Sequence, residues 1–566
     1  MMDSMEMKCT ECGSNFVYDE QSLALYQKMG LTPSGVCFLC STRHRLAFRN
    51  DSVLYPRVCD LCKKQMVSVF APESQHAVYC QTCWWGDAWD PFEHGRDFDF
   101  NRPFFEQFGD LFIKTKKLSL LNLNATNSEY CNYTVGNKNC YLLIGGDFSE
   151  DTYYSHYAMH SKECMDTYWL SHCELCFEAV DCDKCYNVSY ARYCSGCTDC
   201  AFMYDCSGCT DCFGCVNLRN KSYCFFNEQL TREEYKRRRG EYKLSNRAMV
   251  EKAQKEFEAF KLKQPHIFAK QVNCQESSGD NLAGCNSARN CFDVYFETTA
   301  VSDVFLAGWR LNDVVNANHI GHGTDLCAQT AFCPSSNRII GSLTTFNSSE
   351  IWYSYDCHNS NSLFGCSSMR KAEFAILNKQ YTKNEFGILK DKIISHMKET
   401  GEWGKIFPKT LSPFGYNETF ANLIFPLEKK QALQFGFKWN DHDYGTHGKE
   451  TIKINDVPLD IEEVTDDILK EMFACETCGK NFKIIPQELK LRKKLGVPLP
   501  IKDFLCRAKD RLKQRNPLIL HHRQCMCTQK HEHHAQGRCS YEFETTYTPD
   551  RPEMIYCDAC YKKEVY

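Results

Sequence analysis

The sequence lacks the features of a membrane or secreted protein. It has no apolar run of about eighteen residues, the length that a membrane-spanning helix needs. Residues 1–8 are polar and lack the apolar stretch of a secretory signal. The net charge is only −5 over 566 residues, which excludes a polyelectrolyte but leaves room for a local basic patch. We therefore expect a cytoplasmic protein without membrane contact.

The common catalytic fingerprints are also absent. The sequence has no GxSxG, no P-loop, no HExxH and no dinucleotide-binding glycine motif. His319 and His322, with Asp313 and Asp325 nearby, could line a groove as acids and bases. Turn residues are the simpler interpretation, so we expect a non-enzymatic protein and keep an enzyme as an alternative.

What the chain does contain is cysteine, 38 residues of it. Without a secretory signal, a reducing compartment is expected, where thiols serve metals, catalysis or packing rather than disulfides. The spacing of the cysteines separates these roles, because it differs between the two ends and the middle of the chain.

The two ends of the chain are duplicates of one another. Residues 9–59 align without a gap with residues 475–525, and twenty of the 51 positions are identical. An eleven-residue insertion follows in the second copy, after which Cys80 and Cys83 match Cys557 and Cys560. Whatever the first module binds, the second is therefore expected to bind in a similar way.

The first module contains four Cys-x-x-Cys pairs, the spacing of a zinc knuckle. Two zinc ions held by four cysteines each are the simplest account. We favour sequential pairing, first pair with second and third with fourth, although a cross-braced arrangement remains open. The predicted ligands are Cys9, Cys12, Cys37, Cys40, Cys59, Cys62, Cys80 and Cys83.

The second module is less regular. Asp503 stands where the first copy has Cys37, so one site would be Cys475, Cys478, Cys506 and Asp503, or would be degraded and empty. The other site has Cys525, Cys527, Cys557 and Cys560. Its insertion adds further candidates that could substitute for Cys527, namely His531, His533, His534 and Cys539. Three or four zinc ions in all are predicted.

A second duplication occupies the middle of the chain. The passages FGCVNLRNKSYCFFNEQLTREEY, from Phe213, and FGCSSMRKAEFAILNKQYTKNEF, from Phe364, end in capping boxes at Thr231 and Thr382 that start helices. All cysteines from Cys131 to Cys224 are separated by multiples of three. Short strands with stacked equivalent positions indicate a β-solenoid, with an antiparallel sandwich as the alternative. The regular cysteines are expected to pack inside the coils, and zinc or iron–sulfur binding there remains open.

Basic residues recur after the second cysteine pair in both copies. On a helix, Arg45 and Arg49 would share one face, which could grip phosphate groups or could be an ordinary solvated surface. The candidate nucleic-acid-binding residues are Arg43, Arg45, Arg49, Lys509, Arg511 and Arg515.

Three long segments carry a resemblance that spans the chain: YCQTCWWGDAWDPFEHGRDFDFNRPFFEQF, the FGCVNL passage given above, and FETTYTPDRPEMIYCDACYKKEVY. They resemble uncharacterised cysteine-rich zinc-ribbon proteins of candidate-phylum bacteria. The resemblance implies paired-cysteine zinc sites and an intracellular setting, and implies nothing about a substrate.

These observations predict a mainly β protein, a cysteine-rich β-solenoid in two halves flanked by small zinc-ribbon or treble-clef-like modules, with a few helices. The expected parts are 1–95 (first zinc module), 96–230 (first solenoid half), 231–272 (helical connector), 273–381 (second solenoid half), 382–470 (connector) and 471–566 (second zinc module). The predicted function is zinc-dependent binding of RNA or DNA. A scaffold that docks a protein partner is the first alternative.

Overall fold

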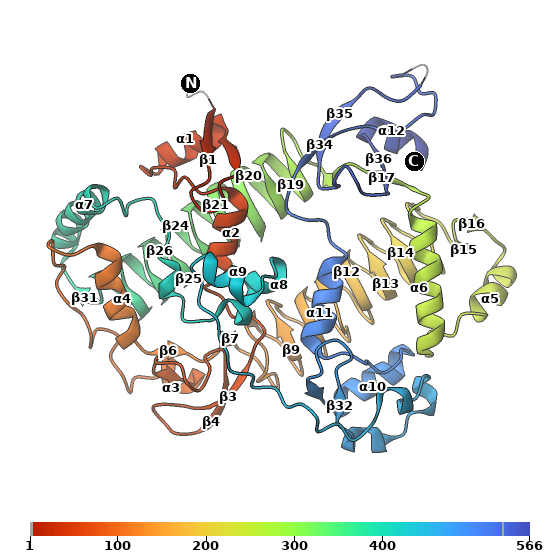
Figure 1. The fold of residues 1–566 in the computed structure, drawn as a ribbon, viewed down its shortest axis with the longest axis horizontal. Helices are drawn as coiled ribbons and strands as arrows, with labels where there is room; N and C mark the ends of the chain where they lie inside the picture. The colour runs from red at the N-terminus through yellow and green to blue at the C-terminus, as the bar shows by residue number, and fades with distance from the viewer. Residues whose placement is uncertain (1–3, 535–536) are drawn as a thin grey trace.

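The structure is a computed structural model that describes residues 4–534 and 537–566. Its first module contains two similar units, each a short hairpin followed by a helix (Figure 1). The first unit comprises β1 (Met5–Lys8), β2 (Asn15–Tyr18), α1 (Glu20–Lys28) and α2 (Phe38–Leu46). The second comprises β3 (Tyr55–Val58), β4 (Gln65–Ser68), β5 (Val78–Tyr79) and α3 (Gln81–Trp85). Both hairpins are antiparallel.

The first solenoid is built from parallel coils of twelve residues. Each strand residue pairs with the residue twelve positions later, as Tyr141 does with Tyr153. From Tyr133 to Phe226 every third residue has a positive φ, so each coil turns four corners and has four sides of three residues. Its strands are β7 (Asn122–Leu123), β8 (Thr134–Val135), β9 (Tyr141–Ile144), β10 (Tyr153–Met159), β11 (Tyr168–Ser171), β12 (Phe177–Asp183), β13 (Tyr186–Arg192), β14 (Thr198–Tyr204), β15 (Cys224–Phe225) and β16 (Glu228–Gln229).

This geometry explains the cysteine rhythm. Every third residue from Cys131 to Cys215 is buried, and these residues line the interior of the coils. A coil with sides of three residues leaves room only for compact side chains, which here are mostly cysteine, serine, threonine, alanine and an occasional leucine. The period of three therefore reflects the number of residues on each side, and the prediction of a β-solenoid is confirmed.

The second solenoid follows the same plan with one irregularity. A register shift lies between Ala283 and Cys285, after which paired residues are thirteen positions apart. The spacing returns to twelve at the pair Ala328 and Ile340. Its ladders are parallel, which excludes the antiparallel sandwich for this region. Its main strands are β19 (Gly279–Arg289), β20 (Cys291–Gly308), β21 (Asn312–Gly321), β22 (Asp325–Ala328), β23 (Ala331–Pro334), β24 (Asn337–Ile340), β25 (Leu343–Phe346), β26 (Ser349–Trp352), β27 (Tyr355–His358), β28 (Asn361–Phe364), β29 (Ser367–Arg370), β30 (Glu373–Ile376) and β31 (Lys379–Gln380).

A helix follows each solenoid at the predicted start signal. Thr382 and Glu385 form a complete capping box. At Thr231 only the threonine half is present, because Glu234 pairs with Arg237 instead. The connecting elements are α4 (Phe104–Lys114), β6 (Lys117–Leu118), α5 (Arg232–Gly240), α6 (Arg247–Lys261), β17 (Pro265–Ile267), β18 (Gln271–Val272), α7 (Lys383–Glu399), α8 (Phe420–Ile424), α9 (Lys429–Gln434) and five short 3-10 helices between Lys409 and Lys470.

The last module repeats the first. Its elements are β32 (Phe473–Ala474), β33 (Asn481–Phe482), α10 (Pro486–Leu495), α11 (Phe504–Lys513), β34 (His521–Gln524), β35 (Glu542–Thr545), β36 (Met554–Tyr556) and α12 (Asp558–Val565). None of the helices in the described ranges is both long and apolar enough to cross a membrane.

The two modules are docked crosswise on the two solenoids (Figure 1). Helix α2 of the first module lies on β21 of the second solenoid, where Arg45 donates to Asn318 at 2.6 Å. Helix α11 of the last module lies on β11 of the first solenoid, where Arg511 reaches Asp166 at 3.2 Å. Helix α4, expected within the first solenoid half, instead packs Phe104 and Phe108 into the core formed with the second solenoid.

Candidate metal centres and a charged cavity

The first candidate metal centre lies between a hairpin turn and the start of a helix. Cys9 and Cys12 lie in the turn that joins β1 and β2, Cys37 caps the N-terminus of α2, and Cys40 lies in its first turn. Their four sulfurs all lie within 4.8 Å of one another, as tetrahedral coordination of one ion requires. The helix N-terminus favours negative charge and so stabilises thiolates at this position.

The second centre repeats this geometry with Cys59, Cys62, Cys80 and Cys83. Cys80 caps α3, as Cys37 caps α2. Burial alone would raise the pKa of Cys59, but the amides of Cys80, Cys62 and Leu61 donate to its sulfur and lower the pKa to about 7. The thiolate that a metal ion needs is thus accessible near neutral pH. In both centres the first pair lies with the second and the third with the fourth, the sequential arrangement.

The third centre contains the aspartate that departs from the cysteine pattern. Asp503 caps α11 by accepting from the Cys506 amide at 3.1 Å, and its other oxygen lies 2.8 Å from the sulfur of Cys478. Burial acts to raise the pKa of Asp503, but hydrogen bonds from Cys478, Cys475 and Cys506 hold it below its ordinary value. The carboxylate therefore occupies the ligand position of Cys37 in the first copy.

In the fourth centre, the alternative ligand Cys539 takes the place of Cys527. Cys539, from the insertion, joins Cys525, Cys557 and Cys560 in a fully buried group whose sulfurs lie within 4.8 Å of one another. Cys527 is not a member of this four-cysteine group. The reason is visible in the alignment, since Cys62 of the first copy corresponds to Thr528, and neighbouring Cys527 is one position out of register with it.

The solenoid cysteines behave as packed thiols. Their sulfurs donate to main-chain carbonyls two residues before and nine residues after, as Cys173 does to Ser171 at 3.4 Å and Cys182 at 3.6 Å. Ser149 occupies the position of Cys173 two coils earlier, and its hydroxyl likewise donates to the main-chain carbonyl nine residues later. Burial raises the pKa of Cys140 and of Cys366 to about 12, so these thiols stay neutral.

The predicted phosphate-gripping surface is wrong for most of its members. Arg45, Arg49 and Arg511 are each only 1% exposed, and Arg515 is also largely covered. Arg45, Arg511 and Arg515 pair with polar groups of the solenoids, because helices α2 and α11 dock through this face. Arg49 pairs with Asp51 of its own module and stacks on solenoid aromatic rings. Arg43 stacks on Phe435 at 4.0 Å. Of the six candidates, only Lys509 is exposed.

The arginines of the last module converge on one buried carboxylate. Asp166, at a solenoid corner, accepts from Arg492 at 3.0 Å and Arg511 at 3.2 Å, and also pairs with Arg507. Burial would raise the pKa of Asp166, but the three guanidinium groups lower it below the ordinary value. Nearby, burial raises the pKa of Glu178 to about 7 in spite of Arg511.

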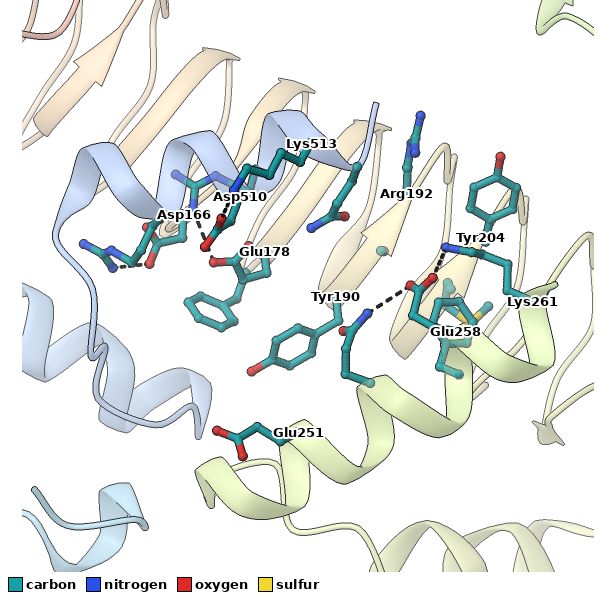
Figure 2. A pocket seen from close by; sticks show the side chains of 18 of the residues that line it. Asp166, Glu178, Tyr190, Arg192, Tyr204, Glu251, Glu258, Lys261, Asp510 and Lys513 are labelled. Carbon is teal, nitrogen blue, oxygen red and sulfur yellow. Dashed lines mark hydrogen bonds and ion pairs between the residues drawn. The ribbon is translucent and has the colours of Figure 1, made fainter. Parts of the chain in front are cut away.

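Beside this cluster lies an open cavity of about 630 Å³. It is enclosed by the first solenoid, by helix α6 and by the segment from α10 to α11 (Figure 2). Nine arginine and lysine side chains line it against six aspartate and glutamate side chains, so its lining is net positive in a protein whose total charge is −5. Such a cavity between separately built parts is a typical location for a ligand site.

Two side chains of β13 contribute a cation and an aromatic ring to the lining of this cavity. Arg192 is 9% exposed and stacks on Tyr193 at 4.4 Å, and among the described residues no carboxylate lies within ion-pair distance of it. Its Nε has no hydrogen-bond partner there. Tyr190 also lines the cavity and is stacked on Phe202 with ring centroids 4.7 Å apart. Its ring and the Arg192 side chain point in different directions (Figure 2). No motif in the sequence marks either residue, since both stand at outward positions of ordinary coils.

The histidines considered for catalysis are placed differently. His319 is half-buried between the solenoids and bonded to the hydroxyl of Tyr157, and desolvation together with Arg49 lowers its pKa well below the ordinary value. His322 stacks on Trp309, and Asp313 pairs with Lys28. Asn312 donates to both Asp313 and Asp325. The two histidines therefore have separate partners, and neither bonds to one of the two aspartates.

A scan against protein-family models and a search of curated proteins gave no match for this chain. The resemblance to candidate-phylum zinc-ribbon proteins therefore stays a prediction.

Proposed function

We propose that this protein is a non-enzymatic, zinc-dependent binding protein whose ligand carries phosphate and occupies the cavity beside helix α6. The observation that carries the proposal is Arg192, a buried cation with no carboxylate partner in the wall of a net positive cavity. An uncompensated buried charge is costly, so a site that keeps one is suited to an anionic ligand.

Tyr190 in the same cavity narrows the ligand class. An aromatic ring and a cation in one cavity can together hold a nucleotide, because the base stacks on the ring and the phosphate pairs with the cation. RNA or DNA thus remains the proposed ligand, with the contact moved from the helices of the zinc modules to the cavity. A free nucleotide would use the same chemistry.

Zinc is the proposed metal because closed groups of four cysteine sulfurs suit its tetrahedral preference. Its role would be structural. The first and last modules hold helices α2 and α11 against the solenoids, and α11 forms one wall of the cavity. Metal in the last module would therefore be required for ligand binding although it does not touch the ligand.

The test measures the affinity of the full-length zinc-loaded protein for four probes. Single-stranded RNA and single-stranded DNA are labelled with fluorescein, and unlabelled adenosine monophosphate and inorganic phosphate compete with them. Replacing Arg192 with glutamine should weaken binding at least tenfold, with a matched loss of salt dependence. Arg232→Ala, an exposed arginine of α5, is the control and should bind like wild type. If binding survives in R192Q but is lost in Lys509→Ala, the ligand does not bind in the cavity and the proposal is contradicted. The order of affinity among the four probes separates a strand from a free nucleotide.

A further inference from the structure

The last module contains more metal-ligating side chains than one four-cysteine centre can use. Beside that centre, Cys527, His531, His534 and Cys560 form a second group whose donor atoms lie within 4.8 Å of one another. The sulfur of Cys527 lies 3.2 Å from His531, and the sulfur of Cys560 lies 3.4 Å from His534. Cys560 belongs to both groups.

A comparison of the first module with the last module shows which metal-ligating residues only the last module has. The first module has a plain four-cysteine centre, and Leu61 occupies the position of Cys527. The eleven-residue insertion of the last module supplies both histidines and also Cys539. Because Cys539 completes the four-cysteine centre, Cys527 is released from it and is left buried beside the histidines.

We infer that the last module binds two metal ions, with the thiolate of Cys560 bridging them. The first ion would take Cys525, Cys539, Cys557 and Cys560, and the second would take Cys527, His531, His534 and the same Cys560. Seven side chains then fill the eight coordination positions of two tetrahedral ions. Zinc fits both positions because it accepts sulfur and nitrogen donors. This inference rests on the proposed function in taking the first position as zinc-bound.

The net charge of the two-ion centre favours a thiolate of Cys560 that bridges both ions. A zinc ion with four thiolates has a net charge of −2, whereas two zinc ions with five thiolates and two neutral imidazoles have a net charge of −1. The second ion thus reduces the buried charge of a centre whose four cysteines are all buried.

The surroundings of the histidines also fit. The Nε2 of His531 faces the sulfur of Cys527, and the Nε2 of His534 faces the sulfur of Cys560, so each imidazole presents one nitrogen to the proposed position of the second ion. Glu564 lies 3.4 Å from the same Nε2 of His531, beside the proposed ligand set.

The experiment is zinc analysis of the full-length protein by mass spectrometry, with protein concentration from amino-acid analysis. His531→Ala/His534→Ala should contain one zinc ion fewer than wild type, and Cys527→Ser should lose the same single ion. His522→Ala, an exposed histidine on β34, is the control and should lose none. His533→Ala should also lose none, although His533 lies 3.1 Å from Cys560. Loss of the ion in H533A would overturn the ligand set.

X-ray absorption at the zinc edge of the wild-type protein gives a second readout that needs no variant. A zinc–zinc distance of about 3.5 to 4 Å is expected, and it should vanish in the double histidine variant. Unchanged zinc content in that variant, with no zinc–zinc scattering in wild type, would refute the bridge and leave the four-cysteine zinc centres standing. Protein without zinc at any cysteine centre would instead refute the proposed function.

Discussion

Replacing Asp166 with asparagine is the sharpest perturbation of how the last module is held. Asp166 is 1% exposed and is the common acceptor of Arg492, Arg507 and Arg511. The substitution keeps the shape of the side chain but removes the counter-ion that the three guanidinium groups share, which leaves them only their ion pairs with Glu488 and Glu178. Removing one partner of a buried ion pair costs about 3–5 kcal/mol. We expect the free energy for opening α11 away from the first solenoid to fall by that amount.

Native-state hydrogen exchange of the α11 amides measures this opening without assuming that so large a protein unfolds in one step. A loss of 3 kcal/mol corresponds to exchange about a hundredfold faster, and 5 kcal/mol to a few thousandfold, at 1.36 kcal/mol per tenfold. Asp183→Asn, a more exposed aspartate on β12, is the matched control and should change exchange in α11 by less than threefold. Exchange in α11 that is unchanged in D166N would refute the view that this cluster holds the module.

Further predictions follow from the same structure. The pKa of Glu178 is raised to about 7 from 4.5, so its contribution to stability is complete below about pH 4.5 and is lost as the pH rises through 7; the melting temperature should fall between pH 5 and pH 8 by more in wild type than in Glu178→Gln. Chelation should remove about 10–16 kcal/mol of binding free energy per site, so limited proteolysis of chelated protein should cut within 5–85 and 471–566 before the solenoids. Cys197→Ser should lower the unfolding free energy by less than about 1.5 kcal/mol and keep the zinc content, because serine occupies the same level at Ser149; Cys197→Phe should cost more, since the coil interior is full. Cys9→Ser should release one zinc ion, and equal zinc content in C9S and wild type would contradict the first centre.

Much of the architecture is readable from the sequence, for reasons that are local. Because each side of a coil has three residues, every third residue points inward, which gives the cysteines their period of three. Four Cys-x-x-Cys pairs supply the ligands for two compact centres. Cys9, Cys12, Cys37 and Cys40 could be assigned to one centre from the sequence, because the two-residue spacing within each pair brings its two sulfurs together locally.

The errors arose where the outcome depends on distant partners. The charge of Arg45 and Arg511 suggested exposure, but the docking faces of the solenoids, which no local pattern reveals, bury both. Cys539 lies fourteen residues beyond Cys525, within an insertion whose path the sequence does not determine. Arg192 is prominent only because three separate parts of the chain meet around it, and none of their described carboxylates lies within ion-pair distance of it.

The crosswise docking has a consequence for synthesis. During translation the first module emerges well before β21, the surface that covers its helix α2, since Arg45 and Asn318 are 273 residues apart. At about 5–20 residues per second that interval lasts at least ten seconds. The metal ion proposed for the first module would therefore have to hold it folded while its docking face is bare, whereas the last module meets a first solenoid that already exists. The two copies, similar in sequence, thus face opposite demands, and under this proposal metal loading of the first module would precede the assembly of the whole chain.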